Sequence, residues 1–120
     1  MRLSLFAVAT GLMLAAAPAA FAHAHLKASD PAAGAKVAPS TSALKLTFTE
    51  AVQPKFCTVT VVDSMGMHAE QGAPLAVPGH PNELTVKLHL QMAGTYTVDW
   101  HALSVDTHKT HGKFNFTVTN

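Results

Sequence analysis

The chain has 120 residues, which is enough for one domain. Eight Lys and Arg residues against seven Asp and Glu give a formal net charge of +1, so the sequence lacks the basic excess that is typical of nucleic-acid-binding domains. The residue type that stands out is histidine, because all eight histidines follow position 22.

The first 22 residues have the anatomy of a secretory signal peptide. Arg2 supplies the positive start, residues 3–17 form an uncharged apolar run, and Ala20-Phe21-Ala22 is a small-x-small cleavage site. A transmembrane anchor is the alternative, but the run is shorter than the ~20 residues that a bilayer span needs. We therefore predict a cleaved signal peptide at 1–22 and a secreted domain at 23–120 that begins with His23.

The rest of the chain alternates apolar and polar residues as β-strands do, with no helical period of useful length. Proline and glycine predict loops at 30–42 and 63–82. The pattern thus predicts an all-β sandwich of about seven antiparallel strands. In chain order the strands are expected at 24–29, 44–48, 56–62, 75–77 (a short edge strand) and 84–90, then around Tyr96–Trp100 and Phe114–Val118.

Tyr96, Trp100 and Cys57 are candidates for the core. The stretch from Leu90 to Tyr96 is similar to a tyrosine corner, in which a tyrosine hydroxyl bonds to a backbone group a few residues earlier, and Trp100 would then lie between the sheets. An ordinary hairpin with an exposed Tyr96 is the alternative. Cys57 is the only cysteine, so no disulfide holds the domain, and its apolar surroundings favour a buried small hydrophobe over a nucleophile.

Cleavage after Ala22 would create a metal chelate at the new N-terminus. The α-amine and the imidazole of His23 can hold one ion together, and an amine with a pKa near 8 loses its proton readily to a metal. Copper(II) prefers such nitrogen and oxygen donors in a tetragonal arrangement. Asp106-Thr107-His108, in the turn between the last two strands, offers a carboxylate and a further nitrogen. A surface turn without metal is the alternative, since D-x-H alone is a weak motif.

Three segments make the chain resemble the CopC copper-resistance family. These are the start HAHLKASDPAAGAKVAPS, the segment LKLTFTEAV at 44–52, and the run AGTYTVDWHALSVDTHKTHGKFNFTV at 93–118. The resemblance covers nearly the whole secreted domain and is weakest in the middle loop. It implies a periplasmic, immunoglobulin-like Greek-key β-sandwich that binds copper(II) through His23, Asp106 and His108, and that passes copper to a CopD-like inner-membrane transporter.

Further residues are candidates for lesser roles at this site. Glu50, in the segment that resembles the family, would orient a ligand or a water, and His111 is near enough in sequence to His108 to assist. His25, the third residue after cleavage, is an accessory ligand or a strand residue. Alternatively, His25 completes a square-planar chelate with two deprotonated backbone amides, which strand pairing of those amides would prevent.

Some members of the family also bind copper(I) in a methionine-rich loop. Here that loop is thin: Met65, Met67 and His68 lie together, with Met92 in another loop. Thioethers favour copper(I), so a weak second site is a chemical option. The alternative is that these methionines fill gaps or are merely exposed.

Three classes of function follow from these patterns. A monomeric periplasmic copper carrier or buffer is the leading one. A copper-dependent oxidative enzyme is the second, because an N-terminal histidine chelate on a β-sandwich resembles the site of lytic polysaccharide monooxygenases. It is disfavoured because the aromatic residues alternate into the core and Asp106 would fill the position that oxygen needs. A structural sandwich with incidental histidines is the third.

Overall fold

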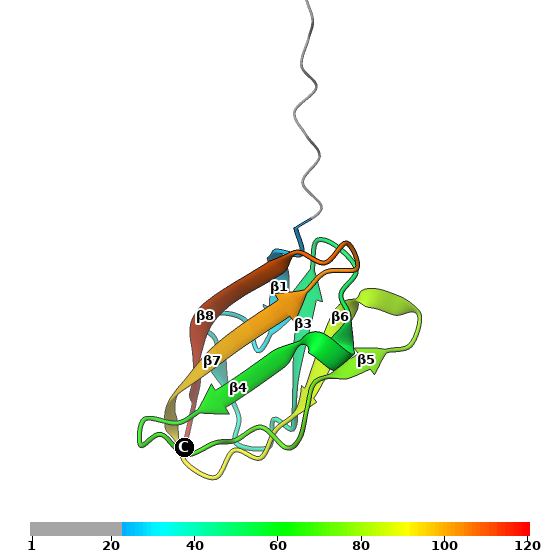
Figure 1. Cartoon of the computed structure of the whole chain (residues 1–120). Helices are drawn as coiled ribbons and strands as arrows, with labels where there is room; N and C mark the ends of the chain where they lie inside the picture. Colours follow the sequence, from blue (N-terminus) through cyan, green and yellow to red (C-terminus); the bar gives the residue numbers. More distant parts are fainter. Residues whose placement is uncertain (1–22) are drawn as a thin grey trace, which may run out of the picture.

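Two four-stranded sheets pack face to face in the computed structural model, which describes residues 23–120 (Figure 1). The expected signal peptide lies outside the described residues. One sheet has the order β1 (Leu26–Asp30), β3 (Ala43–Phe48), β6 (His80–Lys87), β5 (Leu75–Val77), and the other β2 (Lys36–Val37), β8 (Lys109–Val118), β7 (Gly94–Leu103), β4 (Thr58–Val62). A single 3₁₀ turn at Pro54–Phe56 is the only helical element in this range, and no helix there is long and apolar enough to cross a membrane.

The predicted all-β sandwich is confirmed, with differences in detail of which two concern the predicted loops; elsewhere strand ends shift, and Phe56 lies in the 3₁₀ turn before β4. The expected loop at 30–42 contains β2, which pairs in parallel with β8. Two residues are too few to show an alternation, so this strand has no sequence signature. The second difference is that β6 begins at His80, because Pro78 and Gly79 close a tight turn in which Val77 faces His80. Gly79 has a φ of 79°, which suits a glycine turn rather than a long loop.

The core lies between the inner faces of the two sheets. Alternate residues of β3, Leu44, Leu46 and Phe48, are fully buried, while Lys45 between them is exposed. Phe48 meets Trp100 of the other sheet edge to face, with ring centroids 5.3 Å apart. Cys57 is also buried, as expected, and burial raises the pKa of its thiol. The core therefore rests on the same alternation that predicted the strands.

The tyrosine corner is confirmed. Tyr96 is 1% exposed, and its hydroxyl donates to the carbonyl of Met92 at 2.7 Å and accepts from the Met92 amide at 3.2 Å. Its ring stacks on Phe116 with centroids 5.5 Å apart. Trp100 is 6% exposed, as expected for a residue between the sheets. The loop before β7 is thus tied to the core by one side chain.

Removing the Tyr96 hydroxyl should destabilise the domain without changing its shape. Tyr96→Phe leaves two backbone groups of Met92 without their partner, and we expect a loss of about 1–3 kcal/mol in the free energy of unfolding. Denaturant titration measures this loss. Thr95→Ser, on the exposed side of the same strand, is the control and should change the free energy by less than about 0.5 kcal/mol. Equal midpoints for the two variants would refute the role given to the corner.

One pole of the sandwich gathers four chain segments. There β1 and β8 begin, while β3 and β7 end, since Leu26 pairs with Phe48 and Leu103 with Lys109. The two sheets are joined at this pole by the Thr110 hydroxyl, which donates to the carbonyl of Ala24 at 2.8 Å. In Figure 1 the pole is uppermost, with the start of β1 beside the loop between β7 and β8.

Candidate metal centre

The position of His23 is set by hydrogen bonds around it. Ala24 is fully buried, and its carbonyl is held by Thr110. On the other side, the Thr49 hydroxyl donates to the carbonyl of His23 at 3.0 Å and accepts from the amide of His25 at 3.1 Å. The Thr49 amide in turn donates to the carbonyl of His25 at 2.8 Å. The first residues of the domain are therefore fastened to β3 and β8.

The turn from Ser104 to His108 is the second half of the site. Ser104 is 1% exposed, and its hydroxyl oxygen accepts from the His108 amide at 3.1 Å. The Ser104 amide donates to the His108 carbonyl at 3.0 Å, which closes the turn. Thr107 takes a φ of 71°, an uncommon conformation for a β-branched residue. This tight turn holds Asp106 and His108 next to each other at the end of the sandwich.

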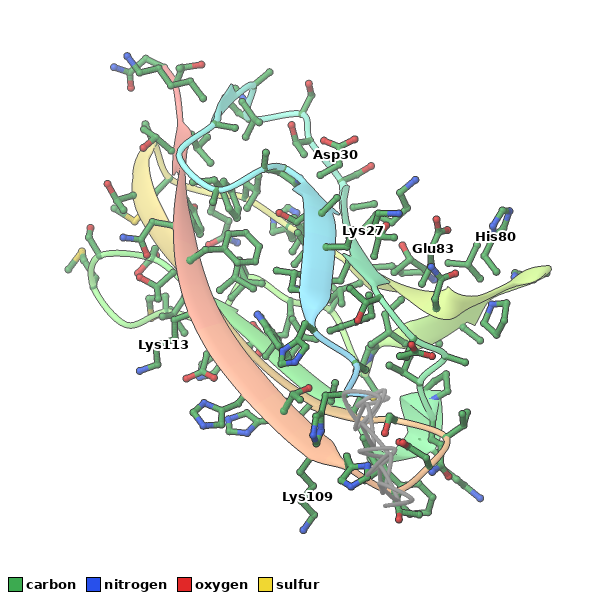
Figure 2. The ribbon with its side chains drawn as sticks, turned by 90° about the horizontal axis from the view of Figure 1, so that it is seen from above. Lys27, Asp30, His80, Glu83, Lys109 and Lys113 are labelled. Atoms are coloured by element: carbon green, nitrogen blue, oxygen red, sulfur yellow. The ribbon has the colours of Figure 1, made fainter. Side chains whose placement is uncertain are left out.

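The structure brings His23, Asp106 and His108 together. The rings of His23 and His108 meet edge to face with centroids 4.5 Å apart. Nδ1 of His108 lies 3.1 Å from Oδ2 of Asp106. The proximity of His23 to the distant turn, which the sequence could only predict, is thus a feature of the fold. In Figure 2, which views the domain from above, Lys109 marks the start of β8 directly after this turn.

Asp106 is held in its ionised form. The Ser104 hydroxyl donates to Oδ1, and this hydrogen bond, with a smaller contribution from His108, lowers the pKa of the Asp106 carboxyl below its ordinary value. Each carboxylate oxygen has two lone pairs, so Asp106 can keep the Ser104 hydrogen bond and still bind a cation. A carboxylate that is charged at neutral pH is the form that a metal ion requires.

Two of the accessory candidates, His25 and Glu50, lie near this centre. The ring of His25 is 5.9 Å from that of His23, and its amide is already hydrogen-bonded to Thr49. Glu50 is exposed just after β3. The next residue, Ala51, accepts a hydrogen bond from Val105, so Glu50 lies at the same pole.

The other candidates lie elsewhere. His111 stacks on His101, with ring centroids 5.6 Å apart, on the outer surface of β7 and β8. Met65 and Met67 are 73% and 62% exposed in the turn after β4, and Met92 is 43% exposed before β7. Val62 pairs with Thr97, so both turns lie at the pole opposite His23. His68 is engaged by Glu70, with Nδ1 2.6 Å from Oε1.

Side chains alone do not complete a metal site here. Within residues 23–120, no group of three or more His, Cys, Asp or Glu side chains is arranged to hold a metal ion. This pole offers four donors only if cleavage before His23 turns its backbone nitrogen into a free amine. The donors would then be two imidazoles, one amine and one carboxylate, a combination that suits copper(II).

The sequence prediction missed the three hydroxyls that build this centre. Thr49, Ser104 and Thr110 each bond to a backbone group or a carboxylate of the site. The only signal for Ser104 is that Ser and Thr often bond to nearby backbone groups where a strand ends in a turn. Thr49 and Thr110 act across 26 and 86 residues of chain, and no local pattern predicts contacts over such separations.

Comparisons with known proteins agree with the fold and the resemblance. The family model described as CopC domain matches residues 26–119. The chain is 37% identical to Protein YobA of Escherichia coli K12, over 84% of this chain and 82% of the relative. It is 36% identical to Copper resistance protein C of Escherichia coli, over 90% of each chain.

Two crystal structures have the same fold. CopC from Methylosinus trichosporium OB3b superposes with a TM-score of 0.74 at 32% identity, over 80% of this chain and 93% of the other. PcoC, a methionine-rich copper resistance protein from Escherichia coli, superposes with a TM-score of 0.70 at 33% identity, over 82% of this chain and all of the other.

Proposed function

This chain belongs to the CopC family, and from that premise we propose that it is a periplasmic copper(II)-binding protein that carries or buffers copper. The proposed ligands are the amine and imidazole of His23, the imidazole of His108 and the carboxylate of Asp106. The names of its relatives, copper resistance protein C and PcoC, support copper as the metal. The family resemblance also favours a periplasmic location, and the amine of His23 requires removal of residues 1–22.

The observation that carries the proposal is the 4.5 Å separation of the His23 and His108 rings, with Asp106 against His108. Residues 85 positions apart are placed so that small ring rotations could direct their nitrogens to one ion. Nδ1 of His108 faces Asp106, so this contact has to open for the imidazole and the carboxylate to bind one ion together. The hydrogen bonds of His25 to Thr49 also support an arm-like chelate at His23 over one that deprotonates backbone amides.

Electron paramagnetic resonance of the cleaved protein with one equivalent of copper(II) tests this set of ligands. We expect a tetragonal signal with coupling to three nitrogens. His23→Gln and His108→Gln should each reduce the number of coupled nitrogens, and Asp106→Asn should change the signal without reducing that number. A signal that is the same in all four proteins would exclude this site.

Copper affinity should weaken as pH falls from about 8 to about 5, because a metal binds only deprotonated ligands and its binding releases protons. Asp106 is not the cause: its pKa is lowered, so it stays ionised over this interval and would take up a proton only at lower pH. Asp106→Asn should therefore lower the affinity at every pH but keep the slope. Competition titrations against a chelator at several pH values measure both, and a flat profile in the unaltered protein would count against the proposed ligands.

Further elements of the proposal rest on the resemblance and on the preference of thioethers for copper(I). These are the delivery of copper to a CopD-like transporter, a monomeric state, and a weak copper(I) site at Met65, Met67, His68 and Met92. At that second site the exposed thioethers are free to rearrange, but His68 would have to leave Glu70 to take part. Copper(I) titration of a Met65→Leu/Met67→Leu variant distinguishes a site from two exposed methionines.

A further inference from the structure

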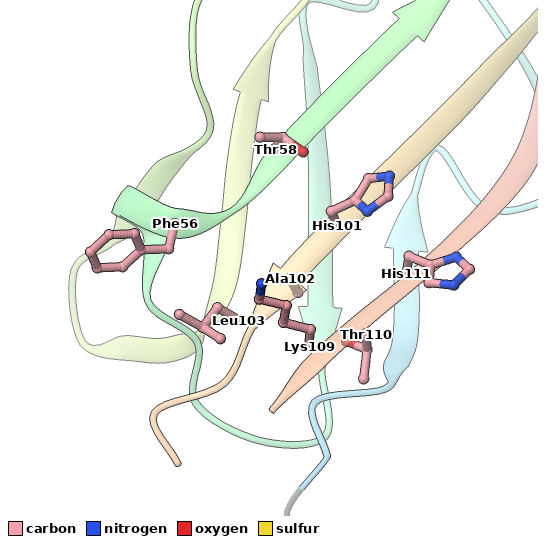
Figure 3. Close-up of a pocket in the computed structure, with 8 residues that line it drawn as sticks. All are labelled: Phe56, Thr58, His101, Ala102, Leu103, Lys109, Thr110 and His111. Carbon is pink, nitrogen blue, oxygen red and sulfur yellow. The ribbon is translucent and has the colours of Figure 1, made fainter. Parts of the chain in front are cut away.

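Two histidines face each other on the outer surface of the second sheet, away from the proposed N-terminal site. His101 of β7 and His111 of β8 are direct partners across the antiparallel pair. Their rings lie side by side, 24° from parallel with centroids 5.6 Å apart. Figure 3 shows both rings on the same side of the neighbouring strands. They border a pocket whose other walls include Phe56, Thr58 and Leu103.

Asp99 orients one of the two rings. It precedes His101 by two residues, so both side chains point to the same face of the strand. Oδ1 of Asp99 lies 3.2 Å from Nε2 of His101, while Oδ2 lies 3.5 Å from the amine of Lys113. With Nε2 facing the carboxylate, Nδ1 is the nitrogen of His101 that remains for a metal. This is the arrangement by which proteins fix the tautomer of a metal-binding histidine and increase its basicity.

The geometry of the strand pair suits a shared ion. A metal at about 2.0–2.1 Å from each nitrogen requires the two nitrogens to be roughly 3–4 Å apart. Side chains directly opposite on antiparallel strands start from Cβ atoms about 4.5–5.5 Å apart, so rotation about χ2 can bring the nitrogens to that separation. His111 is exposed, so its ring has room to turn while Asp99 orients the ring of His101.

We propose that His101 and His111 bind a second divalent transition-metal ion, with copper(II) held more tightly than nickel(II) or zinc(II). Two imidazoles are borderline nitrogen donors, and for such donors affinity rises to a maximum at copper(II). Water completes the coordination, because no third His, Cys, Asp or Glu joins the pair in a metal-binding group within the described part of the chain.

The pair is a site of its own. His111 lies three residues beyond His108, which is about 10 Å along an extended strand. Its neighbour Thr110 points the other way, toward Ala24 and the start of β1. Lys109 and Lys113, which Figure 2 labels, belong to the same strand and lie two residues before and two residues after His111 in the sequence. The pair offers two protein donors where the proposed site at His23 offers four, so this ion is the second to bind. The proposal does not depend on that first site.

A background without the N-terminal ligands isolates the pair. In the domain 23–120 carrying His23→Gln, His25→Gln and His108→Gln, copper(II) alone is titrated by calorimetry. We expect one equivalent to bind. Adding His101→Gln or His111→Gln should weaken this binding about tenfold or more, which corresponds to ~1.4 kcal/mol. His89→Gln, which alters an exposed histidine after β6, is the matched control and should leave the binding unchanged.

Nuclear magnetic resonance shows where the ion binds. In the same background, substoichiometric copper(II) should broaden the ring resonances of His101 and His111 before those of His80 and His89. No binding by the background, or equal effects of His101→Gln, His111→Gln and His89→Gln, would overturn the proposal. Each of these results is separate from failure of the N-terminal site, which is measured in the unaltered domain.

Discussion

Copper(II) affinity should fall by about 100-fold or more when a single residue precedes His23. Changing a group that merely supports a metal ligand already costs about 10–100-fold, and the extension removes a ligand itself by turning the amine into an amide. The imidazole of His23, Asp106 and His108 remain in place, so the loss reports on the amine alone. Competition titration of the domain beginning at His23 against the same domain with one added N-terminal glycine measures the ratio.

A matched extension at the other end of the chain controls for the added residue. Asn120 is exposed and follows β8 at the opposite pole, so one residue after it should leave copper affinity unchanged. Both extended proteins should unfold at the same denaturant concentration as the original, because neither residue enters the core. Equal copper affinity in all three proteins would remove the amine from the site and with it the reason for placing the site at His23.

The sheets and the core could be predicted from the sequence, because the alternation of apolar and polar residues is a local signal. Leu44, Leu46 and Phe48 are buried as their spacing predicts, and Tyr96 forms its corner within five residues of chain. The two-residue strand β2 was not predictable, since its pairing with Val118 depends on a contact across about 80 residues. Gly112 gave no signal either, although a Cβ there would lie 2.8 Å from the Trp100 ring. Glycine at this position leaves room for the ring of Trp100, which is its partner on the neighbouring strand.

In the candidate metal centre, too, some residues could be predicted from the sequence and others could not. His23, Asp106 and His108 were selected by donor chemistry and by resemblance to a family, and the fold places them at one pole. The hydroxyls of Thr49, Ser104 and Thr110 became visible only in three dimensions. His111 illustrates the limit of sequence proximity. It was chosen as an assistant to His108, but strand alternation and pairing place it against His101.

Replacing His108 by glutamine should lower the affinity for the first copper(II) by about 100-fold or more, since it removes a direct nitrogen ligand. The side chain is 54% exposed, and the turn is held by the amide and carbonyl of His108, which glutamine retains. We therefore expect the fold to persist, with an unchanged midpoint of denaturant unfolding. Copper titration of the domain that begins at His23 measures the effect.

His111→Gln is the matched comparison, because it makes the same change three residues further along. It should leave the first equivalent unaffected and weaken only the second, while His108→Gln should do the reverse. This crossed pattern requires that the turn and the β7–β8 surface bind ions separately, since a single shared site would lose affinity in both variants. If both variants instead lose the same affinity for the first copper(II), His111 belongs to the N-terminal centre and there is one site rather than two.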